Sequence, residues 1–332
     1  MRVLITGSAG FIGFHLAKKL VSQGHEVTGA DNFNDYYSQN LKEFRASILK
    51  SECDIFIENL NLANRLEVKN LFDKFRPEYV IHLGAQAGVR LPISDYSKYV
   101  ESNINGFFNV ASCSLENNAA GFLYASSSSV YGDVMSEVLC ENNTNLNPSS
   151  FYGSTKLCNE IMAKSLFNKT LTHSIGLRFF TVYGEYGRPD MAYFKIITNL
   201  LRSTTFNVYG DGSAIRDFTY IDDVTEAISR LVNLCEFSNK PIHEIVNIGG
   251  GNPVSLNSMI SIIEENFGKK LNKKFGSVIQ GDMKKTTACT DKLDGMIGWH
   301  PQTKLQDGLS RFIKWATLPN ISNKIINEWS GT

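Results

Sequence analysis

The fold is decided by residues 2–13, which read RVLITGSAGFIG. An apolar strand runs into a glycine-rich turn, and a helix starts directly after it. Gly7 suits the tight turn, Gly10 lets the backbone approach a pyrophosphate, and Gly13 lets the helix pack close to the strand. The phosphates of a dinucleotide would then meet the positive end of that helix. Three glycines at this spacing are a weak signal by themselves, so the prediction depends on the residues beyond the turn.

The next strand, residues 26–30, ends in Asp31, about 20 residues after the turn, where the fold needs an acid to accept hydrogen bonds from an adenosine ribose. Asn32 comes next, and the sequence places no Arg or Lys nearby. A 2′-phosphate is therefore disfavoured. The sequence predicts NAD rather than NADP.

Charge and composition exclude several classes of partner. Lys and Arg number 33, and Asp and Glu also number 33, so the formal net charge is zero. A neutral chain has no global field to attract nucleic acid or an anionic membrane. No apolar run approaches the roughly 20 residues of a membrane span. We expect neither a nucleic-acid nor a membrane partner, and any anionic ligand must be met by local cations.

The cysteines show no pattern along the chain. They are Cys53, Cys113, Cys140, Cys158, Cys235 and Cys289. There is no CxxC pair and no metal-ligand spacing, and the first strand begins at residue 2, which leaves no room for a signal peptide. We expect reduced thiols, no metal site and a cytoplasmic location.

Strands and helices alternate along the first half of the chain. The expected strands are residues 2–6, 26–30, about 54–57, 79–83 and 121–125. Alternation of this kind predicts an α/β fold with a doubly wound parallel sheet of the Rossmann type. Ligands bind such sheets beyond the carboxyl ends of the strands.

The residues after these strands are candidates for ligand contacts. Asn61 and Leu62 could meet an adenine, although Asn61 is equally suited to forming a turn. Leu83, Gly84 and Ala85 are followed by Arg90, which could serve a substrate phosphate or simply be solvated. Four serines, 126–129, come after the strand at 121–125 and could present hydroxyls into the cleft or form a linker.

Tyr152 and Lys156 are placed for acid–base chemistry. Residues four apart lie on one face of a helix, so the ammonium can approach the phenol oxygen. A free tyrosine has a pKa of about 10. A nearby cation favours the phenolate, which makes Tyr152 usable as a base near neutrality. YxxxK alone is common by chance, but here it comes after a dinucleotide turn and a serine-bearing strand end.

Together these residues resemble the extended short-chain dehydrogenase/reductase family, and within it the UDP-glucuronate 4-epimerases. The similar stretches are DNFNDYY at 31–37, HLGAQAGVR at 82–90, the four serines, RFFTVYG at 178–184 and GRPDMA at 187–192. The resemblance runs from residue 2 to about Trp315. It departs from the family at Asn61 and Asn64, where aspartates are usual, and at Glu185, where Pro is common.

The resemblance implies two interleaved domains. Residues 1–180, with about 217–250, would bind NAD, and residues 181–216 and 251–332 would form a smaller mixed α/β domain that binds the nucleotide sugar. It implies that Phe11, Ile12, Leu83 and Ala85 join the glycines, Asp31, Asn32, Asn61, Leu62, Tyr152 and Lys156 around NAD. Arg216 is expected near a pyrophosphate, with an ion pair to Asp217 or Asp222 as its alternative, and Asp282 near the nucleotide.

The implied reaction inverts C4 of a UDP-sugar. Tyr152, helped by the Ser127 hydroxyl, takes the 4-OH proton while hydride passes to NAD, and the 4-keto sugar then turns over before hydride returns. Lys156 lowers the pKa of Tyr152 and holds the nicotinamide ribose. For a glucuronate the site must also hold a carboxylate, and the candidates are Ser128, Ser129, Thr181 and Arg188, with hydroxyls and a guanidinium suited to that group.

Three other functions compete with this one. A dehydratase or decarboxylase of the family carries an acid where this chain has Ser129. A neutral UDP-hexose or UDP-N-acetylhexosamine 4-epimerase would not need Arg188. A non-catalytic NAD-sensing protein could have lost Tyr152 and Lys156, which are both present.

The family also suggests a homodimer. Its four-helix interface would use the helices expected at about 103–117 and 152–167. Apolar side chains along them are Phe107, Val110, Ala111, Ile161 and Leu166. The alternative is that these side chains simply pack on the sheet.

Overall fold

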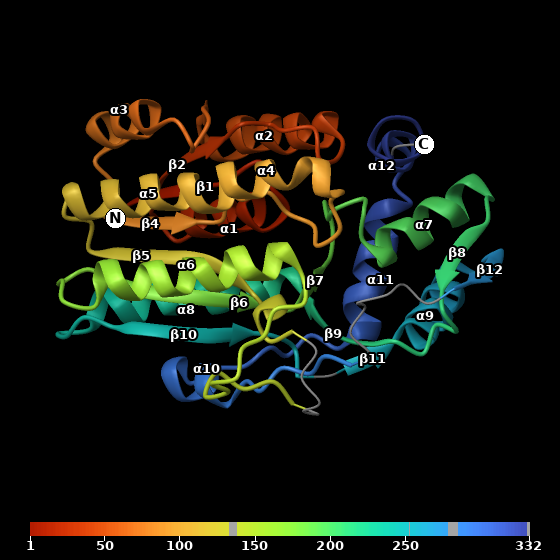
Figure 1. Ribbon diagram of the computed structural model, residues 1–332. Helices are drawn as coiled ribbons and strands as arrows, with labels where there is room; N and C mark the ends of the chain where they lie inside the picture. Colours follow the sequence, from red (N-terminus) through yellow and green to blue (C-terminus); the bar gives the residue numbers. More distant parts are fainter. Residues whose placement is uncertain (133–137, 252, 278–284, 331–332) are drawn as a thin grey trace.

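The computed structural model describes residues 1–132, 138–251, 253–277 and 285–330. Its largest element is a sheet of seven parallel strands in the order β10-β6-β5-β4-β1-β2-β3 (Figure 1). The strands are β1 (Arg2–Thr6), β2 (Glu26–Asp31), β3 (Ile57–Asn59), β4 (Tyr79–His82), β5 (Gly121–Ser127), β6 (His173–Phe179) and β10 (His243–Ile248). The predicted doubly wound α/β sheet is confirmed.

Helices cover both faces of this sheet. The helices α1 (Phe11–Ser22), α2 (Gln39–Cys53) and α8 (Ile221–Phe237) lie on one face, and α3 (Arg65–Phe75), α5 (Phe107–Glu116) and α6 (Phe151–Phe167) on the other. Side chains alternate along each strand, so Val3 and Ile5 join the first core while Leu4 joins the second. Because both faces are covered, β1 and β4 read as continuous apolar runs.

Two predicted boundaries were wrong for local reasons. The strand expected at 54–57 is β3, Ile57–Asn59, because α2 continues to Cys53 and ends at Asp54 in a left-handed conformation (φ +53°). The helix expected from Asn103 begins earlier, with α4 (Tyr96–Tyr99), and passes through a wide π-helical stretch at Val100–Gly106. There Asn103 is buried and its side chain bonds the backbone of Gln86.

The smaller part of the molecule packs beyond the carboxyl ends of the large sheet (Figure 1). It holds a three-stranded sheet, β11-β9-β7, and a two-stranded one, β12-β8. Its elements are β7 (Thr181–Tyr183), α7 (Ala192–Arg202), β8 (Phe206–Tyr209), β9 (Ile215–Tyr220), β11 (Pro253–Ser255), α9 (Leu256–Phe267), β12 (Lys273–Gly276), α11 (Leu305–Ala316) and α12 (Pro319–Lys324). Helix α10 (Asp291–Ile297) packs instead against α8 and β10 of the larger part (Figure 1). Among the described helices, none combines the length and apolar character needed to cross a membrane.

Segments far apart in the sequence are tied together at Asp217, on β9. Its carboxylate accepts backbone N–H groups from Gly250, Gly251 and Ala288 at 2.8, 3.0 and 2.9 Å. Ser255 caps α9, its hydroxyl accepting from the Ser258 N–H. The Asp217 hydrogen bonds hold β9 to the segments around Gly250 and Ala288.

Candidate active site

A cavity of about 1700 Å³ lies at the carboxyl edge of the large sheet. It collects the predicted side chains from both halves of the chain. Its lining includes Gly7, Gly10, Phe11, Ile12, Gly13, Asp31, Asn32, Asn61, Leu62, Leu83, Ala85, Arg90, Ser127, Ser128, Ser129, Tyr152, Lys156, Thr181, Arg188 and Arg216. Asp282 lies outside the described residues.

The glycine turn leaves no space for larger side chains. Gly7 has φ +71°, and a Cβ there would lie 2.7 Å from the Gly84 nitrogen. A Cβ on Gly13 would lie 2.2 Å from the Gly7 carbonyl oxygen. The turn therefore brings α1 against β1 and turns its backbone toward the cavity, which fits the cradle expected for a pyrophosphate.

Asp31 stands at the end of β2, as predicted, but its surroundings differ from the expectation. Its carboxylate accepts N–H groups from Ala9 and Phe33 at 3.1 and 2.9 Å. Burial raises its pKa, and the positive charge of Lys42 opposes that rise. The expectation of no Lys or Arg nearby was thus wrong, because α2 returns Lys42 to the cavity, where its Nζ bonds the Asn34 carbonyl.

The two asparagines that depart from the family pattern both have local structural roles. The Asn61 side-chain oxygen accepts from the Ala63 N–H at 3.0 Å, and its Nδ2 donates to Glu101 at 2.8 Å. Asn64 is the N-cap of α3 and accepts from Leu66 N–H. Asn61 is therefore a turn former that also lines the cavity.

Tyr152 lies in the first turn of α6, which Ser150 caps by accepting the Gly153 N–H at 3.0 Å. Burial raises the pKa of Tyr152, and the Arg188 charge and a hydrogen bond with Ser127 lower it. Lys156 donates to the Ala125 carbonyl at 3.0 Å. Its Nζ is 5.9 Å from the Tyr152 ring centre.

The positive charge that lowers the pKa of Tyr152 thus comes from a different residue than predicted. Lys156 was expected to lower the pKa of Tyr152, but the cation that acts on it here is Arg188. Burial lowers the pKa of Lys156 to about 8. The Lys156 ammonium is held toward β5 by its hydrogen bond to the Ala125 carbonyl.

Ser127, Ser128 and Ser129 line the cavity together and are called the serine cluster here, and the hydroxyls of two of them, Ser127 and Ser129, are in contact. After β5 the chain makes a 3-10 turn at Ser128–Val130, and the Ser127 hydroxyl accepts the Ser129 N–H at 3.1 Å. The two hydroxyls of Ser127 and Ser129 lie 3.2 Å apart. Ser126 instead donates to the buried carboxylate of Glu160 at 2.5 Å.

Arg188 reaches the cavity already paired. Its Nε and Nη2 donate to Asp190 at 3.0 and 2.5 Å, and the Tyr36 hydroxyl donates to the same carboxylate at 3.2 Å. Burial raises the pKa of Asp190, but the charge and hydrogen bonds of Arg188 bring it below its usual value. The Arg188 Nε and Nη2 are thus engaged by Asp190, and within the described residues no carboxylate pairs with Nη1.

The loop that carries Arg188 is anchored to the glycine turn. Arg45 is fully buried and donates to the carbonyls of Ala9, Tyr186 and Gly187 at 2.9, 2.6 and 3.1 Å. This side chain links the two loops directly. Arg45 also donates to the Tyr37 hydroxyl at 2.8 Å. Sequence reasoning missed Arg45 because most of its partners are backbone carbonyls, which no motif reports.

Arg216 was predicted near a pyrophosphate, with an ion pair to Asp217 or Asp222 as the alternative. Arg216 lines the cavity. Asp217 accepts three backbone N–H groups, and Asp222 lies 3.6 Å from Arg311. These contacts give both carboxylates other partners.

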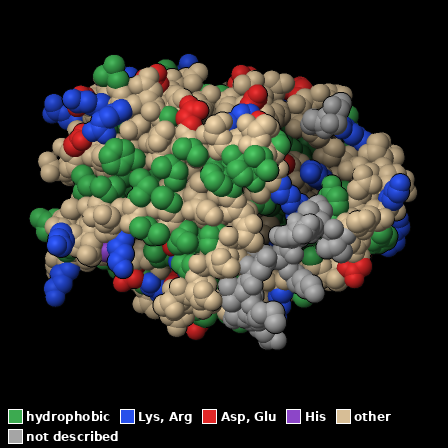
Figure 2. Space-filling model, viewed as in Figure 1, with side chains coloured by type: hydrophobic (Ala, Val, Ile, Leu, Met, Phe, Trp, Pro, Cys, Tyr) green, Lys and Arg blue, Asp and Glu red, His purple; other side chains and the backbone are tan. Residues whose placement is uncertain are grey.

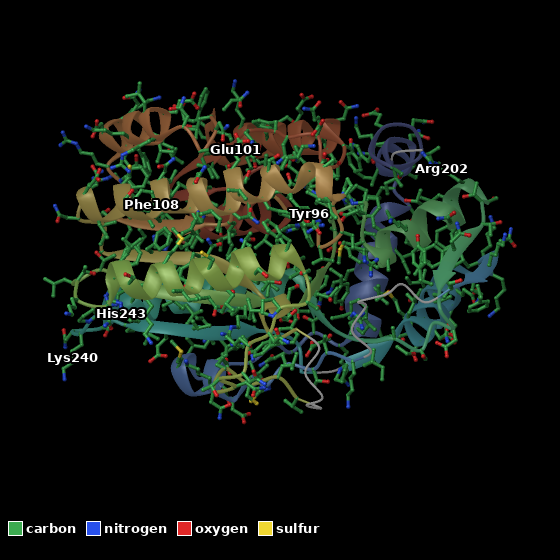
Figure 3. The ribbon with its side chains drawn as sticks, viewed as in Figure 1. Tyr96, Glu101, Phe108, Arg202, Lys240 and His243 are labelled. Carbon is green, nitrogen blue, oxygen red and sulfur yellow. The ribbon has the colours of Figure 1, made fainter. Side chains whose placement is uncertain are left out.

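The described part of the cavity is strongly cationic. Its basic side chains are Lys42, Arg90, Lys156, Arg188, Lys195, Arg202 and Arg216, against Asp31, Asp35 and Asp190. Sequence reasoning missed Lys42, Lys195 and Arg202. Arg202 lies on α7, across the cleft from the large sheet (Figure 3). A cavity that gathers cations in a neutral chain suits an anionic ligand.

Comparison with known proteins identifies the family. Residues 3–249 match the model of the NAD dependent epimerase/dehydratase family. The chain belongs to this family. It is 42% identical over 328 residues to Protein CapI of Staphylococcus aureus, covering 95% of this chain and 98% of that protein.

Two further relatives carry more specific names. The UDP-glucuronate 4-epimerase of Thermodesulfobacterium geofontis is 35% identical over 320 residues, covering 94% of this chain and 95% of that protein. The crystal structure of UDP-glucuronic acid 4-epimerase from Bacillus cereus, in complex with UDP-glucuronic acid and NAD, aligns with a TM-score of 0.87 at 31% identity, over 95% of this chain and 98% of that one. The predicted NAD-dependent epimerase family is confirmed.

Proposed function

We propose that the protein interconverts UDP-glucuronate and UDP-galacturonate by inverting C4, with NAD as a bound cofactor. The observation that carries this proposal is the arrangement of Tyr152, the serine cluster and Arg188 in one cavity. These residues provide a proton acceptor and a carboxylate site at the same place. The similarity to UDP-glucuronate 4-epimerases supports the choice of sugar.

The glycine turn and Asp31 would hold the cofactor. The backbone of Gly7, Gly10 and Gly13 suits the pyrophosphate, and the Asp31 carboxylate suits the adenosine ribose. When bound, NAD supplies an acceptor that takes a hydride from the sugar and gives it back, so no net oxidant is consumed. Lys156 would hold the nicotinamide ribose.

Tyr152 would move the proton of the sugar 4-OH. Its phenol is buried and hydrogen-bonded to Ser127. Deprotonation becomes easier where the Arg188 charge offsets the cost of burial. The Ser127 hydroxyl keeps the phenol oxygen in place and can itself donate to the sugar oxygen.

Arg188, Thr181, Ser128 and Ser129 would hold the sugar carboxylate. Two of the Arg188 nitrogens bond Asp190, so Nη1 faces this task with the hydroxyls. Asp190 and Tyr36 fix the direction of the guanidinium. A clamped carboxylate matters because a 4-keto glucuronate is a β-keto acid that can lose carbon dioxide.

The substitution Arg188→Ala tests this assignment. Removing one partner of a buried charge pair costs on the order of 2–5 kcal/mol, so we expect kcat/KM for UDP-glucuronate to fall by ~10² or more. Trace activity on UDP-glucose should remain nearly unchanged. The control is Arg65→Ala. Arg65 is a surface residue of α3 that pairs with Glu116 of α5, and neither residue lines the cavity. Equal losses on both sugars would place Arg188 at a phosphate and return a neutral-sugar epimerase to contention.

We further propose the interleaved division into domains predicted from the sequence. β10 joins the large sheet although it comes after β8 and β9 in the chain. That order supports assigning residues 1–180 and about 217–250 to the NAD-binding part. Residues 181–216 and 251–332 then form the part that binds the nucleotide sugar. A cytoplasmic location is also proposed, since the six cysteines are free thiols.

A homodimer through α4, α5 and α6 is the proposed assembly, with contacts that agree only in part with those predicted. Phe107, Val110 and Ala111 are buried against the sheet and Leu166 is partly buried there, whereas the predicted Ile161 is 63% exposed. Further exposed apolar side chains are Val100, Phe108 and Phe151. Hydrophobic side chains gather over these helices in Figure 2, and Phe108 is labelled on α5 in Figure 3.

Light scattering tests the dimer. We expect twice the chain mass for the wild type and dissociation in Phe108→Glu/Ile161→Glu, because charge in an apolar interface is costly to bury. Leu171→Glu, at an exposed position outside these helices, is the control. A wild-type monomer at all concentrations would refute the dimer.

A further inference from the structure

Two cysteines that are far apart in the sequence lie side by side. Leu139 and Ala288 form an isolated parallel β-bridge. The Leu139 N–H donates to the Thr287 carbonyl at 2.9 Å, and the Cys289 N–H donates to the Leu139 carbonyl at 3.0 Å. The two segments thus run parallel and in register. Cys140 and Cys289 directly follow the bridged residues and lie next to each other. Both line the same small cavity.

Small molecules can reach this pair. Cys140 and Cys289 are both half-buried and line a cavity of about 400 Å³ together with Glu141, Asp291 and Lys292. Cys113 and Cys235, by contrast, are buried. Burial and the contact with the Cys289 thiol raise the pKa of Cys140 to about 11. Cys140 therefore rests as a thiol.

The backbone around the pair is fixed independently of the thiols. The Asn247 side chain is buried and its Nδ2 donates to both the Leu139 and Cys289 carbonyls, at 2.8 and 3.1 Å. Asp217 holds the Ala288 N–H. The backbone on both sides of the pair is thus held by polar contacts from β9 and β10.

One of the two joined segments leads to the main cavity. Thr286, three residues before Cys289, lines it. The other segment comes after the serine turn at 127–129. A covalent link between Cys140 and Cys289 would therefore join the segment that carries Thr286 to the segment that Asn247 holds against β10.

We propose that Cys140 and Cys289 form a reversible redox-modification site, which closes to an intramolecular disulfide by exchange with a small-molecule disulfide such as oxidised glutathione. One cysteine thiolate attacks the glutathione disulfide and releases one glutathione thiol, leaving a mixed disulfide. The second cysteine attacks that bond and releases the second glutathione. The protein loses two protons and two electrons, and one glutathione disulfide becomes two thiols. The site does not depend on the proposed epimerase reaction.

Mass spectrometry tests the proposal on the full chain with its bound cofactor. The protein is incubated with oxidised glutathione, its remaining thiols are blocked under denaturing conditions, and its peptides are mapped without reduction. We expect one cross-linked species joining the peptides of Cys140 and Cys289, without a retained glutathione, and its loss on treatment with dithiothreitol. Glutathione retained separately on either cysteine, or a chain still reduced at both while Cys53 and Cys158 are modified, would overturn the proposal.

Single substitutions supply the second readout. Cys140→Ser and Cys289→Ser should each stop at a mixed disulfide on the remaining cysteine, whereas Cys158→Ser should cross-link like the wild type. A disulfide that closes a long loop restricts the unfolded chain, so oxidation should raise the Tm of the wild type by several degrees and leave both single variants unchanged. An equal shift in Cys289→Ser would show that the stabilisation comes from elsewhere, and would contradict the site.

Discussion

Helix α6 carries two buried charged side chains one turn apart, Lys156 and Glu160, and they differ in their partners. The Glu160 carboxylate accepts two bonds from Arg178, both at 2.8 Å, and one from Ser126 at 2.5 Å. Among the described residues no carboxylate pairs with Lys156, which bonds the Ala125 carbonyl and has its pKa lowered to about 8 by burial. The Glu160–Arg178 pair anchors α6 to the sheet. Lys156 stays available to interact with a ligand in the cavity.

This contrast separates residues that hold the site from residues that act in it. The Glu160–Arg178 pair joins α6 to β6 and is 3% exposed on each side chain. Tyr152 and Lys156 lie on the same helix but open onto the cavity. Substitutions in the first group should change stability, and those in the second should change turnover.

Tyr152→Phe should cause the strongest change, and that change should be in turnover. Losing a general acid–base group lowers kcat by about 10²–10⁴-fold. The phenyl ring keeps its packing, so the free energy of unfolding should change by at most about 1 kcal/mol, the usual value of one hydrogen bond. Steady-state kinetics and denaturant titration measure the two quantities. A variant with near-normal kcat would place the base elsewhere.

Glu160→Gln should have the next strongest effect, on stability. Breaking a buried ion pair leaves Arg178 uncompensated and costs about 3–5 kcal/mol. The double variant Glu160→Gln/Arg178→Met removes both charges and should recover part of that loss. Urea titration of the three proteins checks this, and kcat of the folded Glu160→Gln fraction should stay within a few fold of wild type. A loss below about 1 kcal/mol would mean that the pair does not anchor α6.

Lys156→Met should give the weakest effect, and it should raise stability rather than lower it. In protein freed of nucleotide, it should increase the free energy of unfolding by roughly 1–3 kcal/mol because the buried ammonium is unpaired. The folded pKa of Lys156 is about 8 against an ordinary 10.5. The penalty is therefore complete below pH 8 and fades as pH rises toward 10.5. The gain of the variant over wild type should shrink over that range, as urea titrations at pH 7 and pH 10 can measure.

Much of the fold could be predicted because its signals are local. Gly7 and Gly13 are required by contacts within the turn itself, and Tyr152 and Lys156 follow from helical spacing. The continuous apolar runs of β1 and β4 indicated burial on both faces. For the same reason all the predicted site residues within the described part of the chain do line one cavity.

The errors arose where the answer depends on packing between distant segments. Lys42 approaches Asp31 only because α2 folds back over β2. Phe107 and Phe108 are adjacent in sequence, yet one is buried and the other 45% exposed, and the π-helical stretch before them shifts the face that a regular helix would present. The Arg188–Asp190 pair and the Cys140–Cys289 contact likewise have no signature in spacing.

The proposed reaction can be followed by NMR, with UDP-glucuronate, the purified protein and no added oxidant. We expect UDP-galacturonate to accumulate to a constant ratio, with no release of carbon dioxide and with NAD unchanged at the end. UDP-glucuronate that stays unconverted while UDP-glucose or a UDP-N-acetylhexosamine gives its 4-epimer, or a pentose product formed with carbon dioxide, would contradict the proposed function.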